Sequence, residues 1–384
     1  MFLLRLRGCR GRDPPMQQPC QSGTTLFSSG NPFKTPRGAP NRQGVVGDPP
    51  MLRAMPSSTH LDAALRAVSA SVRAIALVTQ HPLGRVPCIK PDGSPVTAGD
   101  VAAQAAAAIV LRRELGLAGV VGEESPTSLE GPDADAMRAL ASTAVAGAVG
   151  GFDGDPLEAL AWKAPADARA GFWTLDPIDG TKGYRSSRHY AVCLAHVDAH
   201  GVTHGVLGLP TLVSDMDLAR IGEPPGVLIA ATRGGGSWMH DPATLAPLHR
   251  VQRGAMQGSL RLLNSVEPGG RTARAAAVVE SLGRPWETIA VDSQLKYALV
   301  ALGVGDCIVR VPGSVPRAEH GWDHAAGVLI ATEAGASASD ADGRALDFTL
   351  GEDMTANEGI IVCDPAVHAL LVDAVRAQRT AQRA

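Results

Sequence analysis

Apolar residues recur every three or four positions in a stretch that begins at Thr59, and this spacing predicts an amphipathic helix that ends near His81-Pro82. The apolar positions are Leu61, Leu65, Val68, Val72 and Ile75. A turn rich in Pro and Gly follows, and an Ala-rich run from Thr97 to Gly116 predicts a second helix. The folded part of the chain is therefore expected to begin with two helices in succession.

Short apolar runs bounded by turn residues predict the strands that follow. These runs are 120–121, 172–175, 190–197, 202–209 and 227–232. The last three are spaced as an antiparallel meander requires. After Gly254 the pattern alternates between strands and helices, which predicts a mixed, partly parallel sheet covered by helices. The expected strands are 260–263, 288–291 and 307–311, and the expected helices are 271–282, 294–302 and 323–334. This change divides the body into an α+β domain at 57–254 and an α/β domain at 255–384.

Residues 1–56 lack any helical or strand period and are rich in Arg, Pro, Gly, Ser and Gln. Residues 1–58 carry a formal charge of +6, against −9 for the rest of the chain. Arg5 and Arg7 interrupt the short apolar start, so the composition favours a transit peptide for chloroplast or mitochondrion over a secretory signal. Two alternatives are a disordered extension and a true start of translation at Met51 or Met55, which would place the protein in the cytoplasm.

Composition narrows the class of partner. Hydrophobic residues make up 45% of the 384 residues and charged residues 19%, as in ordinary globular proteins. The longest apolar runs fall far short of the roughly 20 residues that span a bilayer, and the net charge of −3 gives no general attraction to nucleic acid. The six cysteines form no CxxC pair, which argues against a zinc site or a disulfide framework. Neither a membrane nor a nucleic acid is therefore expected as a partner.

Acidic residues at the ends of predicted strands are the candidate chemistry. Asp176 and Asp179 flank Pro177 on a predicted rigid turn, Glu123 ends another strand, and Asp323 begins a helix. Carboxylate oxygens suit Mg²⁺, and two metals about 4 Å apart hold the attacking and leaving oxygens in phosphoryl transfer. The amides after Gly180 could also bind a phosphate at a helix N-terminus.

Each of these residues also has a plainer interpretation. Asp176 could begin an ordinary turn, and Asp323 could serve as a helix N-cap. Asp100 could form a capping box with Thr97, and Glu123-Glu124 could be a solvated loop. Composition and spacing alone thus predict no more than a metal-dependent hydrolase.

The run DPIDGT at 176–181 resembles the signature of the lithium-sensitive, magnesium-dependent phosphatase superfamily, which includes inositol monophosphatase, fructose-1,6-bisphosphatase and the 3′(2′),5′-bisphosphate nucleotidases. From about residue 58 to its end the chain is most similar to the bisphosphate nucleotidases. The matching segments are SPVTAGD at 94–100, VGEES at 121–125, DPIDGTKGY at 176–184, DSQLKY at 292–297, RVP at 310–312 and WDHAAG at 322–327. One departure is Gly270, which occupies a position where the nucleotidases usually carry a His beside the nucleotide.

The resemblance implies a layered αβαβα sandwich with two sheets and flanking helices. It also implies two or three Mg²⁺ ions per site, held by Glu123, Asp176, Asp179, Asp323 and the carbonyl of Ile178. Asp100 and Thr181 would together activate the attacking water. The implied substrate-binding residues are Gly180, Thr181, Ser293, Lys296, Arg310 and Asp323. Among these, Lys296 and Arg310 suit a second phosphate.

The activity that the resemblance implies is removal of the 3′-phosphate from adenosine 3′,5′-bisphosphate, and also from its 5′-phosphosulfate counterpart. An inositol polyphosphate 1-phosphatase or an inositol monophosphatase-type enzyme is the enzymatic alternative. A nucleotide-binding regulator that kept the fold and lost the chemistry is the third possibility. Both a monomer and a homodimer agree with the sequence.

Overall fold

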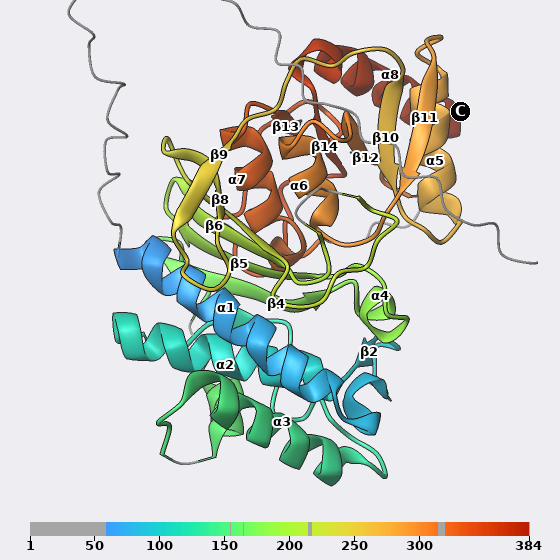
Figure 1. The fold of residues 1–384 in the computed structure, drawn as a ribbon. Coiled ribbons are helices and arrows are strands. Elements are labelled where there is room, and N and C mark those ends of the chain that lie inside the picture. The colour runs from blue at the N-terminus through green and yellow to red at the C-terminus, as the bar shows by residue number, and fades with distance from the viewer. Residues whose placement is uncertain are drawn as a thin grey trace, which may run out of the picture. The chain divides into compact units, whose positions relative to one another are not determined.

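Two large β-sheets alternate with three layers of helices in this protein (Figure 1). A third, two-stranded antiparallel sheet, β1 (Cys88–Ile89) with β2 (Pro95–Val96), lies in the turn before α2. The computed structural model describes residues 59–383 apart from 118, 154, 164, 214–216 and 314–318. The expected tail at 1–56 lies outside the described residues. The described residues all belong to one compact unit.

The order of the layers follows from which helices contact which sheet (Figure 1). One outer layer packs on the larger sheet through α1 (Thr59–Thr79) and α2 (Ala98–Leu115), with α3 (Ala134–Val149) packed against both helices. A central layer, α6 (Leu295–Ala301) and α7 (Ala325–Glu333), lies between the two sheets. The other outer layer is α5 (Gly270–Glu280) and α8 (Pro365–Arg383), on the far side of the smaller sheet. This is the αβαβα sandwich that the resemblance implied.

The larger sheet has seven strands in the order of the sequence. They are β3 (Val121–Gly122), β4 (Phe172–Asp179), β5 (Ala191–Asp198), β6 (Gly201–Leu209), β7 (Val227–Thr232), β8 (Gly236–His240) and β9 (Pro247–Val251). β3 runs parallel to β4, and every later neighbour is antiparallel, so the predicted meander is confirmed. The last two strands were not predicted.

The smaller sheet has five strands in the order β11-β10-β12-β14-β13. They are β10 (Leu260–Asn264), β11 (Trp286–Ala290), β12 (Cys307–Arg310), β13 (Ser337–Ser339) and β14 (Ile360–Cys363). β10 is parallel to β11 and β12, whereas β14 is antiparallel to both of its neighbours, so the sheet is mixed as predicted. The chain passes from one sheet to the other between Val251 and Leu260, although the division into two domains near Gly254 stays a prediction.

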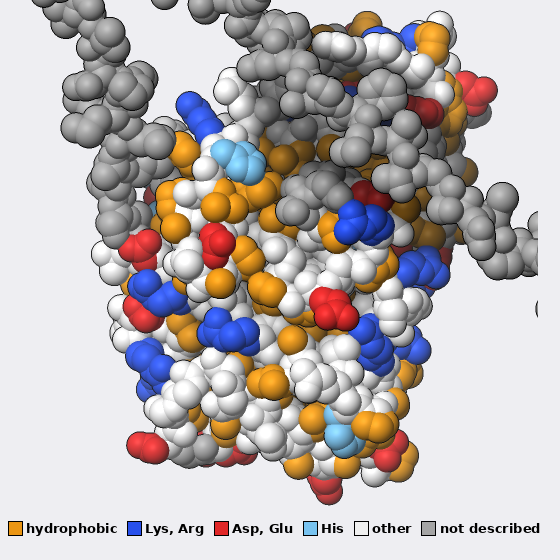
Figure 2. Space-filling model, in the orientation of Figure 1, with side chains coloured by type: hydrophobic (Ala, Val, Ile, Leu, Met, Phe, Trp, Pro, Cys, Tyr) orange, Lys and Arg blue, Asp and Glu red, His pale blue; other side chains and the backbone are white. Residues whose placement is uncertain are grey.

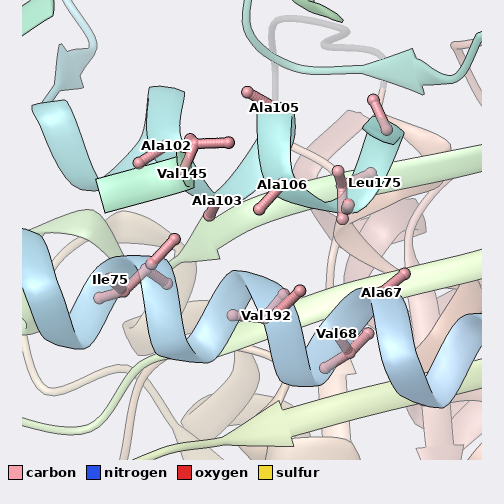
Figure 3. Packing of buried hydrophobic residues seen from close by; sticks show 14 of the residues in the cluster. Ala67, Val68, Ile75, Ala102, Ala103, Ala105, Ala106, Val145, Leu175 and Val192 are labelled. Atoms are coloured by element: carbon pink, nitrogen blue, oxygen red, sulfur yellow. The ribbon is translucent and has the colours of Figure 1, made fainter. Parts of the chain in front are cut away.

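Small side chains allow the first two helices to pack closely on the larger sheet (Figure 3). The close-up shows buried residues of both helices, of α3 and of the sheet pointing toward one another. They include Ala67, Val68 and Ile75 of α1, Ala102, Ala103 and Ala106 of α2, Val145 of α3, Leu175 of β4 and Val192 of β5. Alanine loses no side-chain entropy on burial and favours helix. The alanine-rich sequence thus sets the position of α2 relative to β4.

A helix packs closely on each face of strand β6, because two glycines in the strand leave room for the helices to approach. A Cβ at Gly205 would lie 2.9 Å from the carbonyl oxygen of Ala326 in α7. A Cβ at Gly208 would lie 2.7 Å from Cγ1 of Val68 in α1. Both distances are shorter than carbon atoms tolerate, so each helix contacts the backbone of the strand.

The face that carries α1, α2 and α3 shows Lys and Arg side chains interspersed with Asp and Glu (Figure 2). This mixture agrees with the near-neutral charge of the chain, and the described residues of that face form no continuous basic surface for a polyanion. Among the described helices, none combines the length and the apolar character that a bilayer span requires.

Candidate metal-dependent active site

Asp176 and Asp179 lie at the C-terminal end of β4, so the prediction of a rigid turn after the strand is wrong. The strand continues to Asp179, and its pairing with β5 shifts register between Asp176, which faces Cys193, and Asp179, which faces Ala191. Pro177 lies inside this irregular stretch, where its missing N–H costs no ladder hydrogen bond. Because a bulge inserts one extra residue, it brings side chains three positions apart to the same side of the strand.

Two further carboxylates reach the same end of β4 from other elements. Glu123 follows β3, the parallel neighbour of β4, and its N–H donates to the carbonyl of Leu175 at 3.3 Å. Asp323 is the last residue of a 3₁₀ turn, η3 (Gly321–Asp323), which packs on β4 and β5. His324 rather than Asp323 is the N-cap of α7, so the N-cap interpretation of Asp323 is wrong.

These acidic groups repel one another in a buried place. Burial, followed by the charges of Glu123, Asp179 and Asp323, raises the pKa of Asp176 well above its ordinary value. Burial and then Asp323 raise the pKa of Asp179 to about 7. Burial also raises the pKa of Asp323 to about 6, against the opposing effect of Arg310. Such a cluster is stable in its charged form only with cations nearby.

The donor set fits a hard divalent cation. Asp176 is 2% exposed, and its Oδ1 atom has no hydrogen-bond partner among the described residues. A buried carboxylate oxygen without a partner, surrounded by other carboxylates, is what an oxygen-ligated metal site provides in its metal-free form. The carbonyl of Ile178 lies between the two aspartates in sequence and accepts a hydrogen bond from the Thr181 hydroxyl at 3.2 Å.

Asp100 and Thr181 are not hydrogen-bonded to each other within the described part of the chain. Oδ2 of Asp100 accepts from the Thr97 hydroxyl at 2.6 Å and from the Thr97 N–H at 2.8 Å, which is the capping box at the start of α2. Burial, followed by Glu124 and Glu123, raises the pKa of Asp100 well above its ordinary value. The capping interpretation is confirmed, and the joint role of Asp100 and Thr181 stays a prediction.

Lys90 is a site residue that the sequence reasoning missed. Its Nζ lies 3.0 Å from Oε1 of Glu123 and 3.0 Å from Oε1 of Glu124. Burial opposes the charge of Lys90, but the two glutamates outweigh it and raise its pKa. The Glu124 side chain is fully buried, so the solvated-loop interpretation of this segment is wrong. The available signal was the single Lys at the head of the Pro/Gly-rich turn that leads into α2.

Two adjoining cavities open beside the carboxylates. The first, of about 320 Å³, is lined by Glu123, Asp179, Gly180, Thr181, Ser293 and Lys296, among others. The second, of about 330 Å³, is lined by Arg271, Lys296 and Arg310, among others, and shares Ser265, Glu267 and Lys296 with the first. A larger cavity of about 610 Å³ beside α3 contains none of the predicted site residues. An acidic chamber is thus continuous with a basic one.

Gly180 and Ser293, which both line the first cavity, lie in close contact. Gly180 has a φ of 90° and is the N-cap of α4 (Thr181–Arg185), a helix of only five residues. A Cβ at Gly180 would lie 3.1 Å from Cβ of Ser293, which itself has a φ of 67°. The left-handed backbone and the close approach together require glycine at 180.

In the basic chamber, the carboxylate of Glu319 pairs with the arginine side chains. Glu319 receives Arg310 at 2.7 Å, lies 3.6 Å from Arg271 and contacts Nε2 of His324 at 3.3 Å. Despite its burial, the hydrogen bond with His324 and the charge of Arg310 lower the pKa of Glu319 to about 2. Burial lowers the pKa of Lys296, whose Nζ donates to the carbonyl of Val291 at 3.4 Å. Gly270 begins α5 next to this chamber.

Comparison with known proteins agrees with this geometry. Residues 85–380 match the Inositol monophosphatase family. A 3′(2′),5′-bisphosphate nucleotidase of Emericella nidulans is 31% identical over 321 residues, covering 75% of this chain and 89% of that protein. Another from Oryza sativa is 30% identical and covers 85% and 97%.

Solved structures share the fold. CysQ from Bacteroides thetaiotaomicron, described as a bacterial member of the inositol monophosphatase family, has a TM-score of 0.54 at 20% identity and covers 80% of this chain and 97% of its own. A staphylococcal IMPase-II has a TM-score of 0.56 at 14% identity, with coverages of 84% and 96%. From its sequence match, its relatives and its layered fold, this chain belongs to the inositol monophosphatase family.

Proposed function

We propose that this protein is a Mg²⁺-dependent phosphatase that hydrolyses the 3′-phosphate of adenosine 3′,5′-bisphosphate to give AMP and inorganic phosphate, and that acts likewise on the 5′-phosphosulfate counterpart. The observation that supports this proposal is that the first cavity, beside the carboxylates, adjoins the second cavity, which contains Lys296 and Arg310. A substrate with two phosphate groups needs both cavities, one for each phosphate. The names of the nucleotidase relatives support the same choice.

The proposed metal ligands are the carboxylates of Glu123, Asp176, Asp179 and Asp323 with the Ile178 carbonyl, for two or three Mg²⁺ ions. When bound, Mg²⁺ lowers the pKa of water and neutralises charge on the phosphoryl oxygens. Asp100, held by Thr97 at the start of α2, would accept the proton of the attacking water, and the Thr181 hydroxyl would orient it. The water oxygen forms a bond to phosphorus while the bond to the 3′-oxygen breaks, and that oxygen takes up a proton.

Lys296 and Arg310 would bind the phosphate that is not cleaved. Lys296 lines both cavities, and Arg310 presents a guanidinium already oriented by Glu319. A guanidinium and an ammonium near each other favour a group with two negative charges. Gly180, Thr181 and Ser293 line the narrow junction near Asp179 and would position the phosphate that is cleaved.

A comparison of substrates tests the proposal. Release of inorganic phosphate is measured with Mg²⁺ from adenosine 3′,5′-bisphosphate, inositol 1,4-bisphosphate and inositol 1-phosphate, with the nucleotide product identified by chromatography. Faster turnover of the adenosine bisphosphate, with AMP as product and inhibition by millimolar Li⁺, supports it. Faster turnover of either inositol phosphate makes this an inositol phosphatase, and binding without turnover of any substrate makes it a regulator.

The basic chamber has its own test. Lys296→Met should raise KM for adenosine 3′,5′-bisphosphate by at least about tenfold, since a charge-assisted contact is worth about 1.5–3 kcal/mol. The same variant should leave KM for adenosine 3′-phosphate, which lacks the 5′-phosphate, nearly unchanged. Equal increases in KM for both substrates would show that Lys296 does not bind the second phosphate.

We also propose that residues 1–56 direct the protein to chloroplast or mitochondrion. Their Arg-rich, acid-poor composition supports this. A fluorescent protein fused behind residues 1–56 should enter the organelle, and a fusion that stays in the cytoplasm would contradict the proposal.

A further inference from the structure

A further cavity of about 370 Å³ lies beside α4 and adjoins the first cavity. The residues that line it, and that define the lateral cavity, are Arg85, Lys182, Arg185, Ser186 and Glu267. Lys182 and Glu267 line the first cavity as well, so the two cavities meet at this pair. The lining of the lateral cavity includes none of the proposed metal ligands and neither Lys296 nor Arg310. Three cationic side chains and one carboxylate therefore give it a positive charge of its own.

Tyr184 holds the guanidinium of Arg85 in place. Arg85 is the last residue of a 3₁₀ turn, η1 (Pro82–Arg85), and its Nη1 donates to the carbonyl of Tyr184. Its Cζ also lies 4.8 Å from the centre of the Tyr184 ring. That ring is buried, and its hydroxyl donates to the carbonyl of Gly84 at 2.9 Å. Since a guanidinium has five N–H donors, Arg85 is fixed by these contacts and can still donate to an anion.

The short helix α4 brings two more cations to the lateral cavity. Lys182 and Arg185 are three positions apart, which places them on the same side of a helix. Both side chains are exposed, and among the described residues no carboxylate pairs with Arg185. Ser186, the C-cap of α4, adds a hydroxyl to the lining. Arg185 is therefore the cation of this cavity that is most available to an incoming anion.

Glu267 competes with any anion for the charge of Lys182. Its Oε2 lies 2.8 Å from Nζ of Lys182, and the two side chains are 63% and 67% exposed. An exposed ion pair contributes little to stability, so Lys182 can exchange this carboxylate for a doubly charged group at small cost. The pair joins α4 to the segment between β10 and α5, 85 positions away in the sequence. An anion in the lateral cavity would thus release that segment from α4.

We propose that the lateral cavity binds a phosphate dianion through Arg85, Lys182 and Arg185, at a position distinct from the two phosphate positions of the proposed substrate. Guanidinium groups match the oxygens of phosphate with paired hydrogen bonds, and the excess of cations favours a group with two negative charges. The phosphate comes either from inorganic phosphate that leaves the first cavity after hydrolysis or from a third phosphate group of a substrate. The site depends only on its own cavity and charges, whereas these two sources rest on the proposed function.

Titration of the full chain with inorganic phosphate tests the site. Calorimetry is done at low ionic strength in a chelator, so that no Mg²⁺ holds phosphate at the carboxylates and no turnover is needed. Arg185→Gln should weaken phosphate binding at least about tenfold, because a charge-assisted contact is lost. Arg188→Gln is the matched control, since it removes an exposed arginine that does not line the lateral cavity, and it should bind as wild type does. Equal phosphate binding by the two variants would overturn the proposal.

A variant with the opposite expected effect completes the titration. Glu267→Gln should strengthen phosphate binding, because the competing carboxylate loses its charge. Unchanged or weaker binding would show that Glu267 does not compete with the anion and would overturn that part of the proposal.

Steady-state kinetics with Mg²⁺ distinguish the two sources of the phosphate. If the occupant is inorganic phosphate, Arg185→Gln should weaken product inhibition by phosphate relative to Arg188→Gln. If it is a third phosphate group of a substrate, Arg185→Gln should raise KM for inositol 1,3,4-trisphosphate about tenfold and leave KM for inositol 1,4-bisphosphate unchanged. Equal values for the two variants in both measurements would overturn both sources. An enzyme that turns over no phosphate ester would contradict the proposed function, whereas the titration in chelator would still decide the lateral site.

Discussion

The backbone N–H of Gln294 donates a hydrogen bond to Oδ2 of Asp179. The Gln294 side chain is buried, and its Nε2 donates to the carbonyl of Trp322 at 2.7 Å while its Oε1 accepts from the N–H of Gly327 at 2.9 Å. One residue at the start of α6 therefore connects the end of β4 to the turn that carries Asp323. Two carboxylates that are 144 positions apart in the sequence are held together through it.

Replacement of Gln294 by Ala should lower the free energy of unfolding by about 2–4 kcal/mol, because a buried carbonyl and a buried N–H lose their partners. The half-saturating Mg²⁺ concentration should rise as well, since Asp323 is less firmly placed. Urea unfolding and Mg²⁺ titration of activity measure the two effects. Gln252→Ala, at an exposed position, is the matched control and should change stability by less than about 0.5 kcal/mol. A stable Gln294→Ala with normal Mg²⁺ dependence would contradict this role.

Asp176→Asn should reduce kcat by at least about 100-fold while leaving the metal-free protein at least as stable as wild type. The amide has nearly the same shape but carries no charge, so it removes a proposed metal ligand and also relieves the repulsion that raises the pKa of this carboxyl. Phosphate release and thermal unfolding in a chelator separate the two effects. Loss of both activity and stability would point to misfolding instead.

Mg²⁺ binding should weaken as the pH falls through 7. The pKa of Asp179 is raised to about 7 in the metal-free protein, so below that pH a proton occupies the carboxylate that the cation needs. At pH 6 about one molecule in ten has this group ionised, which predicts a roughly tenfold higher half-saturating Mg²⁺ concentration than at pH 8. Activity measured against Mg²⁺ concentration at both pH values gives the ratio. Equal half-saturating Mg²⁺ concentrations at pH 6 and pH 8 would show that Asp179 does not titrate in this range.

Lys90→Met should destabilise the protein by about 3 kcal/mol, because it leaves the buried Glu124 carboxylate without its cation. The loss should be smaller in saturating Mg²⁺, since a cation near Glu123 then replaces part of the missing charge. Lys90→Arg keeps the charge and should recover most of the stability. Chemical unfolding with and without Mg²⁺ measures both effects. Equal losses of unfolding free energy in the two conditions would show that Lys90 is not coupled to the proposed metal site.

The cysteines of the folded body should be inert. The four described cysteines, Cys88, Cys193, Cys307 and Cys363, are all buried and unpaired by disulfides. Burial raises the pKa of Cys363 to about 12, so about one thiol in ten thousand is ionised at pH 8. In a variant with Cys9 and Cys20 replaced by Ser, a thiol reagent should react slowly until urea is added. Rapid reaction of the native protein would contradict this.

Helix positions and most strands could be predicted because their apolar spacing is local. The boundaries of α2 follow from Thr97, Asp100 and Gly116, which cap its two ends. β9 was missed because four of its five residues are exposed, so its pattern carries no alternation to detect. The end of β4 was predicted as a turn because Asp and Pro favour turns in isolation, whereas pairing with β5 holds the segment extended.

The candidate site required information that no single segment contains. The proposed metal ligands were identified through resemblance to a family, and their meeting depends on parallel pairing of β3 with β4 and on the position of η3. Lys90 and Gln294 act through contacts with residues 28 to 115 positions away. A helix Gln and a turn Lys have no distinctive local pattern, so only the structure identifies them.

The close contacts at Gly205 and Gly208 set the thickness of the molecule around β6. On the α7 side the contact joins main-chain atoms of Gly205 and Ala326, which have no rotamer to change, whereas on the α1 side it is made by the side chains of Val68 and Val72. A shift of β6 would therefore be passed directly to α7, whose first turn follows Asp323. The spacing between the larger sheet and this helix beside the candidate site is thereby fixed by the backbone itself, so substitutions elsewhere in the core can accumulate without altering it.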